Sequence, residues 1–587
     1  MPFLDTPEGT PDDKIGWGSD VAAAMLRLSG IKYVSLNPGA SYRALHDSIV
    51  NHLGNRDPGM LLCLHEDHVI GIAHGYAKAT DEPMGAIVHA NVGLMHGHMA
   101  IFNAFCDRVP MIIMGATGPM DSHQRRPWID WIHTSQDQAG IVRDILKFDV
   151  QPSSPEAIVD GMLRANIATR TEPCAPVYIV LDAGLQEASL ERPMTMPDML
   201  RFKAPASPRA HGDDIQKIVT LIKSAKRPMI LFGRGTRAQK DWDARVELAE
   251  SIGACVMSDL KNGAVFPTDH PAHVTEPLTH IPAKAHNDLL AEADLILAFE
   301  WIDLGGCICP PTGGIDVRAK IVNITMDHHL HNGAHMVYQA MAPADVLISA
   351  SSEAVIHDLN GALGGGKKEP WRAAVRRKFT PNESGKIRMV DVAVELRKNF
   401  ADPDAVSLPF VGRGWPFDLW PFRAPHAYMG KDGGGGIGSG PSISIGVALA
   451  NSDRGRETVT VLGDGDFLMG GHAIYTAVKH QIPILFIINN NQSYFNDVLH
   501  QETVAKRRNR PIGNRWIGQS ISNPFVDIAK FAEAQGATGI GPVTLLADLP
   551  AAIKKGVEIM RAGGVCLIDV HIPPADRGTS SAGLRNT

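Results

Sequence analysis

The amino-acid sequence predicts an α/β protein made of three doubly wound domains, each built on a parallel sheet. Apolar runs of strand length alternate with helical runs over residues 16–190, and further apolar strands follow residue 207. Between 459 and 493, strand, helix and strand follow within about 30 residues, as in a βαβ unit. A chain of 587 residues has room for three or four domains. Repeated βα units imply a parallel sheet covered by helices.

The first domain contains most of these units. Asp20–Ser29 is expected to form an amphipathic helix that ends at Gly30, because glycine is favoured just after a helix. Further elements are expected as strands at 31–36, 61–64, 84–88, 111–114 and 177–181, and as a helix at 68–79. Because carboxyl ends of parallel strands meet at one edge of a sheet, His65-Glu66 and His89 are expected close together.

Two looser segments divide the remaining chain. Residues 187–206 carry three prolines and mixed charge, and residues 361–385 carry GGGKKEP, so both are interpreted as linkers. The predicted domains are residues 1–190, 207–360 and 386–587. Gly233-Arg234-Gly235 follows the first strand of the central domain. A short Gly-x-Gly is weak evidence for a nucleotide loop, so we interpret it as a turn.

Composition excludes several classes of function. The net charge is −7 and no long basic run occurs, so nucleic acid is not an expected partner. No apolar stretch reaches 18 residues, which argues against a membrane span. The first residues lack the basic and apolar regions of a signal peptide, and seven scattered cysteines form no disulfide framework. A cytoplasmic location is therefore expected.

The strongest chemical signal is Gly463-Asp464-Gly465 after one apolar strand and Asn491 after the next. In a βαβ unit both strand ends lie at the same sheet edge, so Asp464 and Asn491 are expected side by side. One carboxylate and one amide oxygen suit Mg²⁺, which shares its coordination with the phosphates of a ligand. Glycines at such a turn let backbone amides approach an anion closely.

This stretch resembles the motif of enzymes that use thiamine diphosphate (ThDP), in which GDG is followed by NN after a helix. The resemblance implies that Asp464 and Asn491 bind Mg²⁺ through their side chains and Ser493 through its carbonyl. It extends over nearly the whole chain, to the acetolactate synthase, benzoylformate decarboxylase and benzaldehyde lyase branch. The three domains would then be pyrimidine-binding, central and diphosphate-binding. Motifs that carry it are Asn37-Pro38-Gly39, His65-Glu66, Gly75-Tyr76-Ala77, Asp107-Arg108-Val109-Pro110 and Gly436-Ile437-Gly438.

The resemblance also implies roles for individual residues. Glu66 would bind the aminopyrimidine ring that removes the C2 proton of ThDP, and His89 matches a histidine that benzoylformate decarboxylase uses. The cofactor-binding residues would be Asn37, Pro38, Gly39, Glu66, Arg413, Gly414, Gly436, Ile437, Gly463, Asp464, Gly465, Asp466 and Asn491. The family has Gln-His after Val-Gly where this chain has Arg413-Gly414, so that contact departs from the pattern.

Three functions remain open at this stage. The first is an enzyme that cleaves or forms a C–C bond beside a carbonyl: a 2-oxo acid decarboxylase, a 2-hydroxy-ketone or 2-hydroxyacyl lyase, or a carboligase. Its substrate would be a small 2-oxo acid, aldehyde, acyloin or 2-hydroxyacyl compound. The second is an acetolactate-synthase-like enzyme or oxidase with FAD in the central domain. The third is a non-catalytic subunit of the same fold.

The resemblance implies a homodimer or homotetramer whose sites combine Glu66 of one chain with Asp464 of another.

Overall fold

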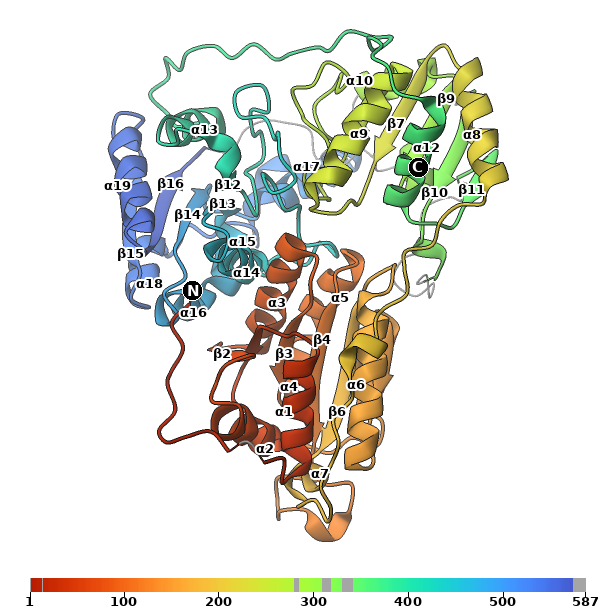
Figure 1. Ribbon diagram of the computed structural model, residues 1–587. Helices are drawn as coiled ribbons and strands as arrows, with labels where there is room; N and C mark the ends of the chain where they lie inside the picture. Colours follow the sequence, from red (N-terminus) through yellow and green to blue (C-terminus); the bar gives the residue numbers. More distant parts are fainter. Residues whose placement is uncertain (1, 13, 279–283, 309–317, 330–341, 574–587) are drawn as a thin grey trace.

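Three parallel sheets, each with helices on its faces, confirm the predicted fold class (Figure 1). The computed structural model describes residues 2–12, 14–278, 284–308, 318–329 and 342–573. The N-terminal sheet has six strands in the order β2-β1-β3-β4-β6-β5. The central sheet has the order β11-β10-β9-β7-β8, and the C-terminal sheet β12-β13-β14-β16-β15. In Figure 1 the N-terminal domain lies below the other two.

The inner strands β3 and β4 of the N-terminal sheet are buried along their whole length, as expected for a parallel sheet covered on both faces. Its strands are β1 (Tyr33–Leu36), β2 (Gly59–Leu62), β3 (Met84–Val88), β4 (Met111–Thr117), β5 (Phe148–Val150) and β6 (Pro176–Asp182). Its helices are α1 (Gly18–Leu28), α2 (Arg43–Asp47), α3 (Glu66–Thr80), α4 (Asn91–His96), α5 (His98–Cys106), α6 (Pro155–Arg170) and α7 (Ala183–Glu187). Short 3₁₀ turns include η1 (Ala40–Tyr42) and η3 (Ser122–Gln124).

The central domain repeats this design on a smaller scale. Its strands are β7 (Pro228–Phe232), β8 (Cys255–Ser258), β9 (Leu295–Phe299), β10 (Lys320–Ile324) and β11 (Val346–Ile348). Its helices are α8 (Gly212–Ser224), α9 (Gln239–Ile252), α10 (Lys284–Glu292), α11 (Leu304–Ile308) and α12 (Ser352–Leu363). Helix α12 therefore continues past residue 360, where the sequence predicted a linker to begin.

The C-terminal domain contains the predicted βαβ unit as β13, α15, α16 and β14. Its strands are β12 (Val406–Ser407), β13 (Glu457–Gly463), β14 (Ile484–Asn490), β15 (Thr538–Val543) and β16 (Val565–His571). Its helices are α13 (Met389–Lys398), α14 (Gly440–Ser452), α15 (Asp464–Gly470), α16 (Ile474–Lys479), α17 (Phe495–Arg507), α18 (Ile528–Glu533) and α19 (Leu549–Arg561). Two 3₁₀ turns, η9 (Gly471–Ala473) and η10 (Ile512–Trp516), interrupt the helical segments.

Two local predictions in the first domain were wrong. Strand β2 ends at Leu62 rather than Leu64, and helix α3 begins at Glu66 rather than His68. The reason is a cap, since the His65 Nδ1 atom accepts a hydrogen bond from the Asp67 amide at 3.1 Å. Glu66 is therefore the first residue of a helix, not a strand-end residue.

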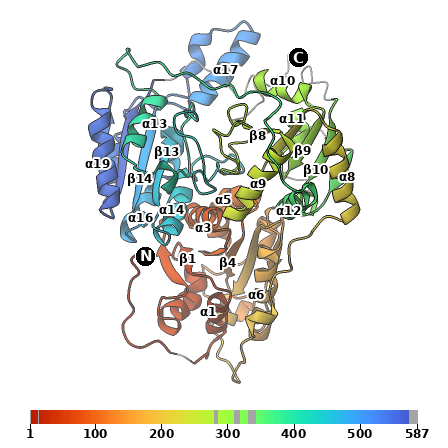
Figure 2. The same ribbon diagram turned by 45° about the horizontal axis from the view of Figure 1, so that its top comes forward.

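The N-terminal and C-terminal domains pack through helices α3 and α14, which Figures 1 and 2 both show side by side. Their backbones come so close that a Cβ atom on Gly75 would lie 1.9 Å from the Ile443 carbonyl oxygen. A Cβ on Gly446 would lie 2.0 Å from the Ile72 carbonyl oxygen. Gly75 of the Gly-Tyr-Ala motif thus has a packing role, because it lets the N-terminal and C-terminal domains pack closely.

Helices long and apolar enough to cross a lipid bilayer are absent from the described part of the chain. All six cysteines described there are free thiols.

Candidate cofactor and active site

The carboxyl ends of β13 and β14 bring the three predicted metal ligands together. Strands β13 and β14 pair in parallel, with Gly463 opposite Asn489, so the residues that follow each strand are neighbours. The Asp464 Oδ2 atom accepts a hydrogen bond from the Ser493 amide at 3.1 Å. The Ser493 hydroxyl donates to the Asn491 Oδ1 atom at 2.7 Å. Asp464, Asn491 and Ser493 thus form one hydrogen-bonded cluster at the sheet edge.

Asp464 is buried, with 2% of its surface exposed, and burial raises its pKa to about 6. The hydrogen bonds that oppose this shift come from backbone amides. A buried carboxylate is much more favourable when a cation lies beside it. A carboxylate, an amide oxygen and a nearby carbonyl are the hard ligands that Mg²⁺ prefers. The cluster therefore suits a magnesium ion.

Gly436-Ile437-Gly438 lies beside this cluster and is held by two residues. The Asp466 Oδ1 atom accepts a hydrogen bond from the Gly438 amide at 2.5 Å, and burial raises the pKa of Asp466 to about 7. The side-chain amide of Asn103, on α5, accepts from the Gly436 amide at 3.4 Å and donates to the Gly436 carbonyl at 3.3 Å. Asp466 therefore organises this loop, and the Ile437 side chain stays 47% exposed.

Arg413 and Gly414 lie at the same edge of the sheet. The chain continues from β12 alongside β13, where the Val461 amide donates to the Phe410 carbonyl at 3.1 Å. Gly414 follows in a left-handed conformation, with φ +86°. Arg413 is exposed, so its side chain is accessible to a ligand at this edge.

The segment after Ser493 folds back onto the end of the loop that follows β14. It folds as α17 and η10 and then returns, so that the Tyr494 amide donates to the Gln519 carbonyl at 2.9 Å. The Ile521 amide donates to the Gln492 carbonyl at 2.8 Å. The returning segment at residues 519–521 is therefore bonded directly to the loop that carries the predicted metal ligands.

The N-terminal sheet gathers the second group of predicted residues at its own carboxyl edge. Strands β2, β1 and β3 are neighbours, and they lead to Glu66, Asn37 and His89 respectively. The Asn37 side-chain amide donates to the Cys63 carbonyl at 3.0 Å, which ties the ends of β1 and β2 together. Glu66 is 6% exposed, and its Oε2 atom lies 3.0 Å from the His96 Nδ1 atom. Pro38 and Gly39 form the turn between Asn37 and η1.

His89 is held by two neighbours. The Ser41 hydroxyl lies 2.7 Å from the His89 Nδ1 atom, and the His133 ring meets the His89 ring edge-on at 4.7 Å. Burial, together with the nearby His133, lowers the pKa of His89 to about 4. The His89 ring is therefore neutral at pH 7. It can accept a proton, and then transfer it, without first being deprotonated.

The sequence predicted no site role for four residues that build these two edges: His96, Asn103, His133 and His472. His96 and Asn103 lie on short helices that give no motif of their own. His472 of η9 brings the C-terminal domain to the start of α3, where its ring lies 4.2 Å from the His68 ring. The only local signal was the unusual density of histidines at positions 65–98.

Glu66 and Asp464 share no polar contact in the described structure, although the two domains meet through Asn103 and His472. In the described structure the polar contacts of the Glu66 side chain stay within the N-terminal domain, and those of Asp464 stay within the C-terminal domain.

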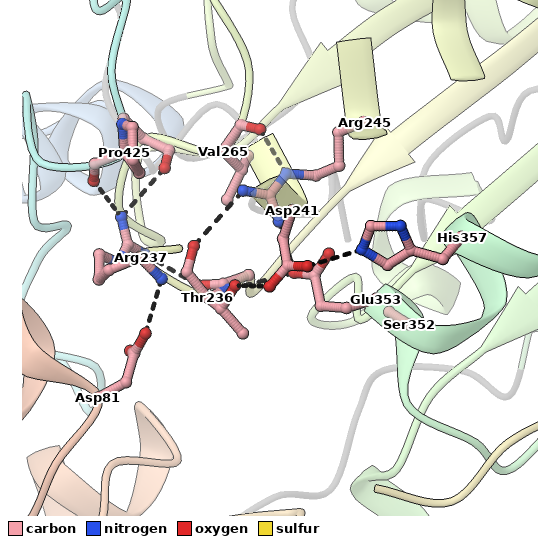
Figure 3. Close-up of polar contacts among 12 residues, drawn as sticks. Asp81, Thr236, Arg237, Asp241, Arg245, Val265, Ser352, Glu353, His357 and Pro425 are labelled. Carbon is pink, nitrogen blue, oxygen red and sulfur yellow. Dashed lines mark hydrogen bonds and ion pairs between the residues drawn. The ribbon is translucent and has the colours of Figure 1, made fainter. Parts of the chain in front are cut away.

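An ionic network lies at the carboxyl edge of the central sheet (Figure 3). The Arg237 guanidinium donates to the carbonyls of Ala264 and Pro425 at 3.0 and 2.7 Å. Arg245 pairs with Glu353 at 2.5 Å, and Figure 3 shows Asp241 held between Thr236 and His357 in the same network. A cavity of about 330 Å³ adjoins these residues and reaches the N-terminal domain near Asp81.

Three models of thiamine pyrophosphate (ThDP) enzymes match successive parts of the chain. The N-terminal TPP binding domain matches residues 16–141, the central domain residues 215–350, and the C-terminal TPP binding domain residues 413–570. The chain belongs to the thiamine pyrophosphate enzyme family. The resemblance inferred from the sequence is thereby confirmed, and the ThDP-binding domains are present.

Relatives within this family are distant. Acetolactate synthase 1 from Nicotiana tabacum is 24% identical over 95% of this chain and 82% of that protein. The acetolactate synthase large subunit of Haemophilus influenzae is 23% identical over 95% of both chains. Benzoylformate decarboxylase from Polynucleobacter necessarius has the same fold, with a TM-score of 0.79 at 18% identity, covering 96% of this chain and 100% of that one. The 4-hydroxybenzoylformate decarboxylase of Rhodococcus jostii RHA1 has a TM-score of 0.77 at 19% identity, and the match again covers 96% of this chain and 100% of that one.

The first turn of the central domain does not fit a dinucleotide diphosphate. The amides of Gly233 and Arg234 donate to the carbonyls of Phe299 and Glu300. The Thr236 amide donates to Glu353 at 3.1 Å, and the Arg237 amide to Asp81 at 2.7 Å. These four amides are used within the protein, so they cannot hold a phosphate as a nucleotide loop does.

Packing explains the Gly-x-Gly of this turn. A Cβ atom on Gly233 would lie 1.8 Å from the Glu300 carbonyl oxygen, so only glycine fits there. The interpretation of Gly233-Arg234-Gly235 as a turn therefore agrees with its contacts.

Proposed function

We propose that this protein is a ThDP- and Mg²⁺-dependent enzyme that cleaves or forms a C–C bond next to a carbonyl group. Its reaction would be the decarboxylation of a 2-oxo acid, the cleavage of a 2-hydroxy ketone or 2-hydroxyacyl compound, or carboligation. The observation that carries the proposal is the hydrogen-bonded cluster of Asp464, Asn491 and Ser493 in a chain that belongs to the ThDP family.

The residues of the chain have distinct tasks in this proposal. Asp464, Asn491 and the Ser493 carbonyl hold Mg²⁺, and the loop around Gly436 and Arg413 holds the diphosphate. When bound, ThDP supplies an electron sink. Glu66 holds a hydrogen bond to the aminopyrimidine ring and exchanges a proton there. His89, neutral at pH 7, accepts or donates a proton at a substrate hydroxyl group.

We also propose that each site forms between two copies of the chain, in a homodimer or homotetramer. The lack of a polar contact between Glu66 and Asp464 in the described part of one chain is in keeping with this. Large apolar side chains next to both edges are exposed: Val92 38%, Met95 55%, Met99 39%, Ile437 47% and Met469 51%. A second copy would cover this surface, since isolated proteins seldom expose such clusters.

FAD is not part of the proposal, because the amides of the central turn are already bonded within the protein. A purified protein that is yellow and loses activity when FAD is removed would instead support the acetolactate-synthase-like or oxidase alternative. A protein that binds ThDP but never exchanges its C2 proton would support the non-catalytic alternative.

The test of function is hydrogen–deuterium exchange at C2 of ThDP, followed by NMR with Mg²⁺ present. The wild-type protein should accelerate exchange, and Glu66→Gln should lower the rate by about 10²–10⁴-fold, the range of general acid–base catalysis. The amide in Glu66→Gln cannot exchange a proton with the ring, although it can still form a hydrogen bond. Purified protein should then be screened against 2-oxo acids, acyloins and 2-hydroxyacyl thioesters.

Shared sites are tested by mixing Glu66→Gln chains with Asp464→Ala chains. Each variant should be inactive alone. A mixed dimer contains one site that carries neither substitution, so refolded mixtures should recover part of the activity. Mixed dimers that form and stay inactive would contradict shared sites.

A further inference from the structure

The Glu66 carboxylate has one side-chain hydrogen-bond partner in the described structure, and that partner is His96. The His96 Nδ1 atom lies 3.0 Å from the Glu66 Oε2 atom. The Glu66 side chain is 8% exposed, whereas the His96 side chain is 59% exposed. One edge of the imidazole therefore faces the buried carboxylate, while much of the ring is open to solvent.

The same short helix, α4, controls both oxygens of the carboxylate. Gly93 lies three residues before His96, so both residues share one face of the helix. A Cβ atom on Gly93 would lie 2.8 Å from the Glu66 Oε1 atom. Helix α4 thus offers bare backbone to Oε1 and an imidazole to Oε2, so Oε1 has no side-chain hydrogen-bond partner in the described structure.

His65 fixes the orientation of the His96 ring. The two rings are stacked, with centroids 4.9 Å apart and an interplanar angle of 21°. His65 is itself held, because its Nδ1 atom accepts from the Asp67 amide at 3.1 Å. His65, Glu66 and His96 could together hold a metal ion. The capping bond leaves the proton of neutral His65 on Nε2, so a hydrogen-bonded arrangement is favoured over coordination.

We propose that His96 is a positioning residue that holds the Oε2 atom of Glu66 and turns the Oε1 atom toward the aminopyrimidine ring. The proposal rests on the function proposed above, because it concerns the same carboxylate. His96 touches Glu66 and not the reacting atoms. Its donor bond keeps the carboxylate in one rotamer in the absence of ligand, so that no reorganisation is needed when the cofactor binds.

The test compares His96→Leu, His96→Gln and a control, His123→Gln, which removes an exposed histidine on η3. His96→Leu has no donor, so C2 exchange should slow by about tenfold to a hundredfold, the effect expected from losing one hydrogen bond to a charged group. His96→Gln keeps a donor and should stay within about threefold of wild type at pH 7. His123→Gln should leave the rate unchanged.

A binding measurement separates positioning from general damage. The affinity of the Mg²⁺-loaded protein is measured for ThDP and for inorganic diphosphate alone. His96→Leu should weaken ThDP binding and leave diphosphate binding unchanged, because only ThDP carries the ring that meets Glu66. Equal weakening of both ligands would overturn the proposal, since it would indicate a misfolded site.

The pH profile of exchange provides a third readout. Other titratable groups near Glu66 and His96 come from several elements: Tyr42 of η1, His65, Asp67 and His68 at the start of α3, His89 after β3, and His472 of η9. All of them remain in His96→Gln, so a pH dependence of exchange that wild type has and this variant lacks is caused by the substitution of His96. If His96→Leu exchanged the C2 proton as fast as wild type, this inference would be overturned but the proposed function would not. A wild-type protein that does not accelerate exchange would overturn the proposed function as well.

Discussion

The two halves of the candidate site are built in opposite ways. At the C-terminal edge, Asp464, Asn491 and Ser493 are bonded to one another and to backbone amides, so their polar contacts lie within one domain. At the N-terminal edge, Glu66 and His89 are held by other side chains, His96 and Ser41. The first half is therefore suited to hold a fixed ion, and the second to move protons.

This difference also explains why the first half could be predicted more fully. The metal cluster depends on the βαβ connection alone, because parallel pairing places the residues after β13 and β14 side by side. The partner of Glu66 lies 30 residues away on a helix that no motif identifies. The contact depends on how α4 packs against α3, and such tertiary packing is not encoded in a local pattern.

The largest loss of function is expected from a substitution at the C-terminal edge. Asp464→Ala should abolish Mg²⁺-dependent ThDP binding, because it removes the buried carboxylate and the acceptor of the Ser493 amide. Isothermal titration of the apoprotein with ThDP measures this. Asp497→Asn, which changes an exposed carboxylate on the nearby helix α17, is the matched control and should bind normally. Unchanged affinity in Asp464→Ala would contradict the assignment of the metal site.

The sequence predicted the three-sheet fold for a similarly physical reason, since buried parallel strands are apolar throughout. It was less successful where one side chain decides the local structure. The His65 cap starts α3 at Glu66, two residues before the predicted start. The Gly-x-Gly of the central domain was interpreted as a turn, in agreement with the structure, but the partners of its amides are tertiary contacts that no local pattern shows.

The next largest loss of function is expected from a substitution at the N-terminal edge. His89→Ala should keep ThDP binding and lower turnover by about 10²–10⁴-fold, the usual contribution of general acid–base catalysis. His133→Ala tests the neighbouring ring separately. A His89→Ala variant within a few-fold of wild type, on the true substrate, would reduce His89 to a structural role.

The pH dependence of His89 has a definite sign. Burial and His133 lower its pKa in the folded protein to about 4, from an ordinary value of 6.5. Between these values the unfolded chain binds a proton that the folded protein does not, so stability falls as pH decreases from 6.5 toward 4. The acid limb of turnover due to His89 should lie near pH 4, and His89→Ala should lose it. A limb that persists in the variant would belong to another group.

The smallest effect concerns the residue that orients His89. Ser41 is buried, and its hydroxyl lies 2.7 Å from the His89 Nδ1 atom. Ser41→Ala removes this bond but leaves the imidazole in place, so turnover should fall only about two- to tenfold, the kinetic equivalent of one neutral hydrogen bond. Ser48→Ala is the matched control, because Ser48 is also buried but bonds Ser19 and Asp20 away from the site. It should lower the melting temperature without changing turnover. If Ser41→Ala were as damaging as His89→Ala, the hydroxyl itself would act on the substrate. If it had no effect, the ring of His133 would be sufficient to hold His89.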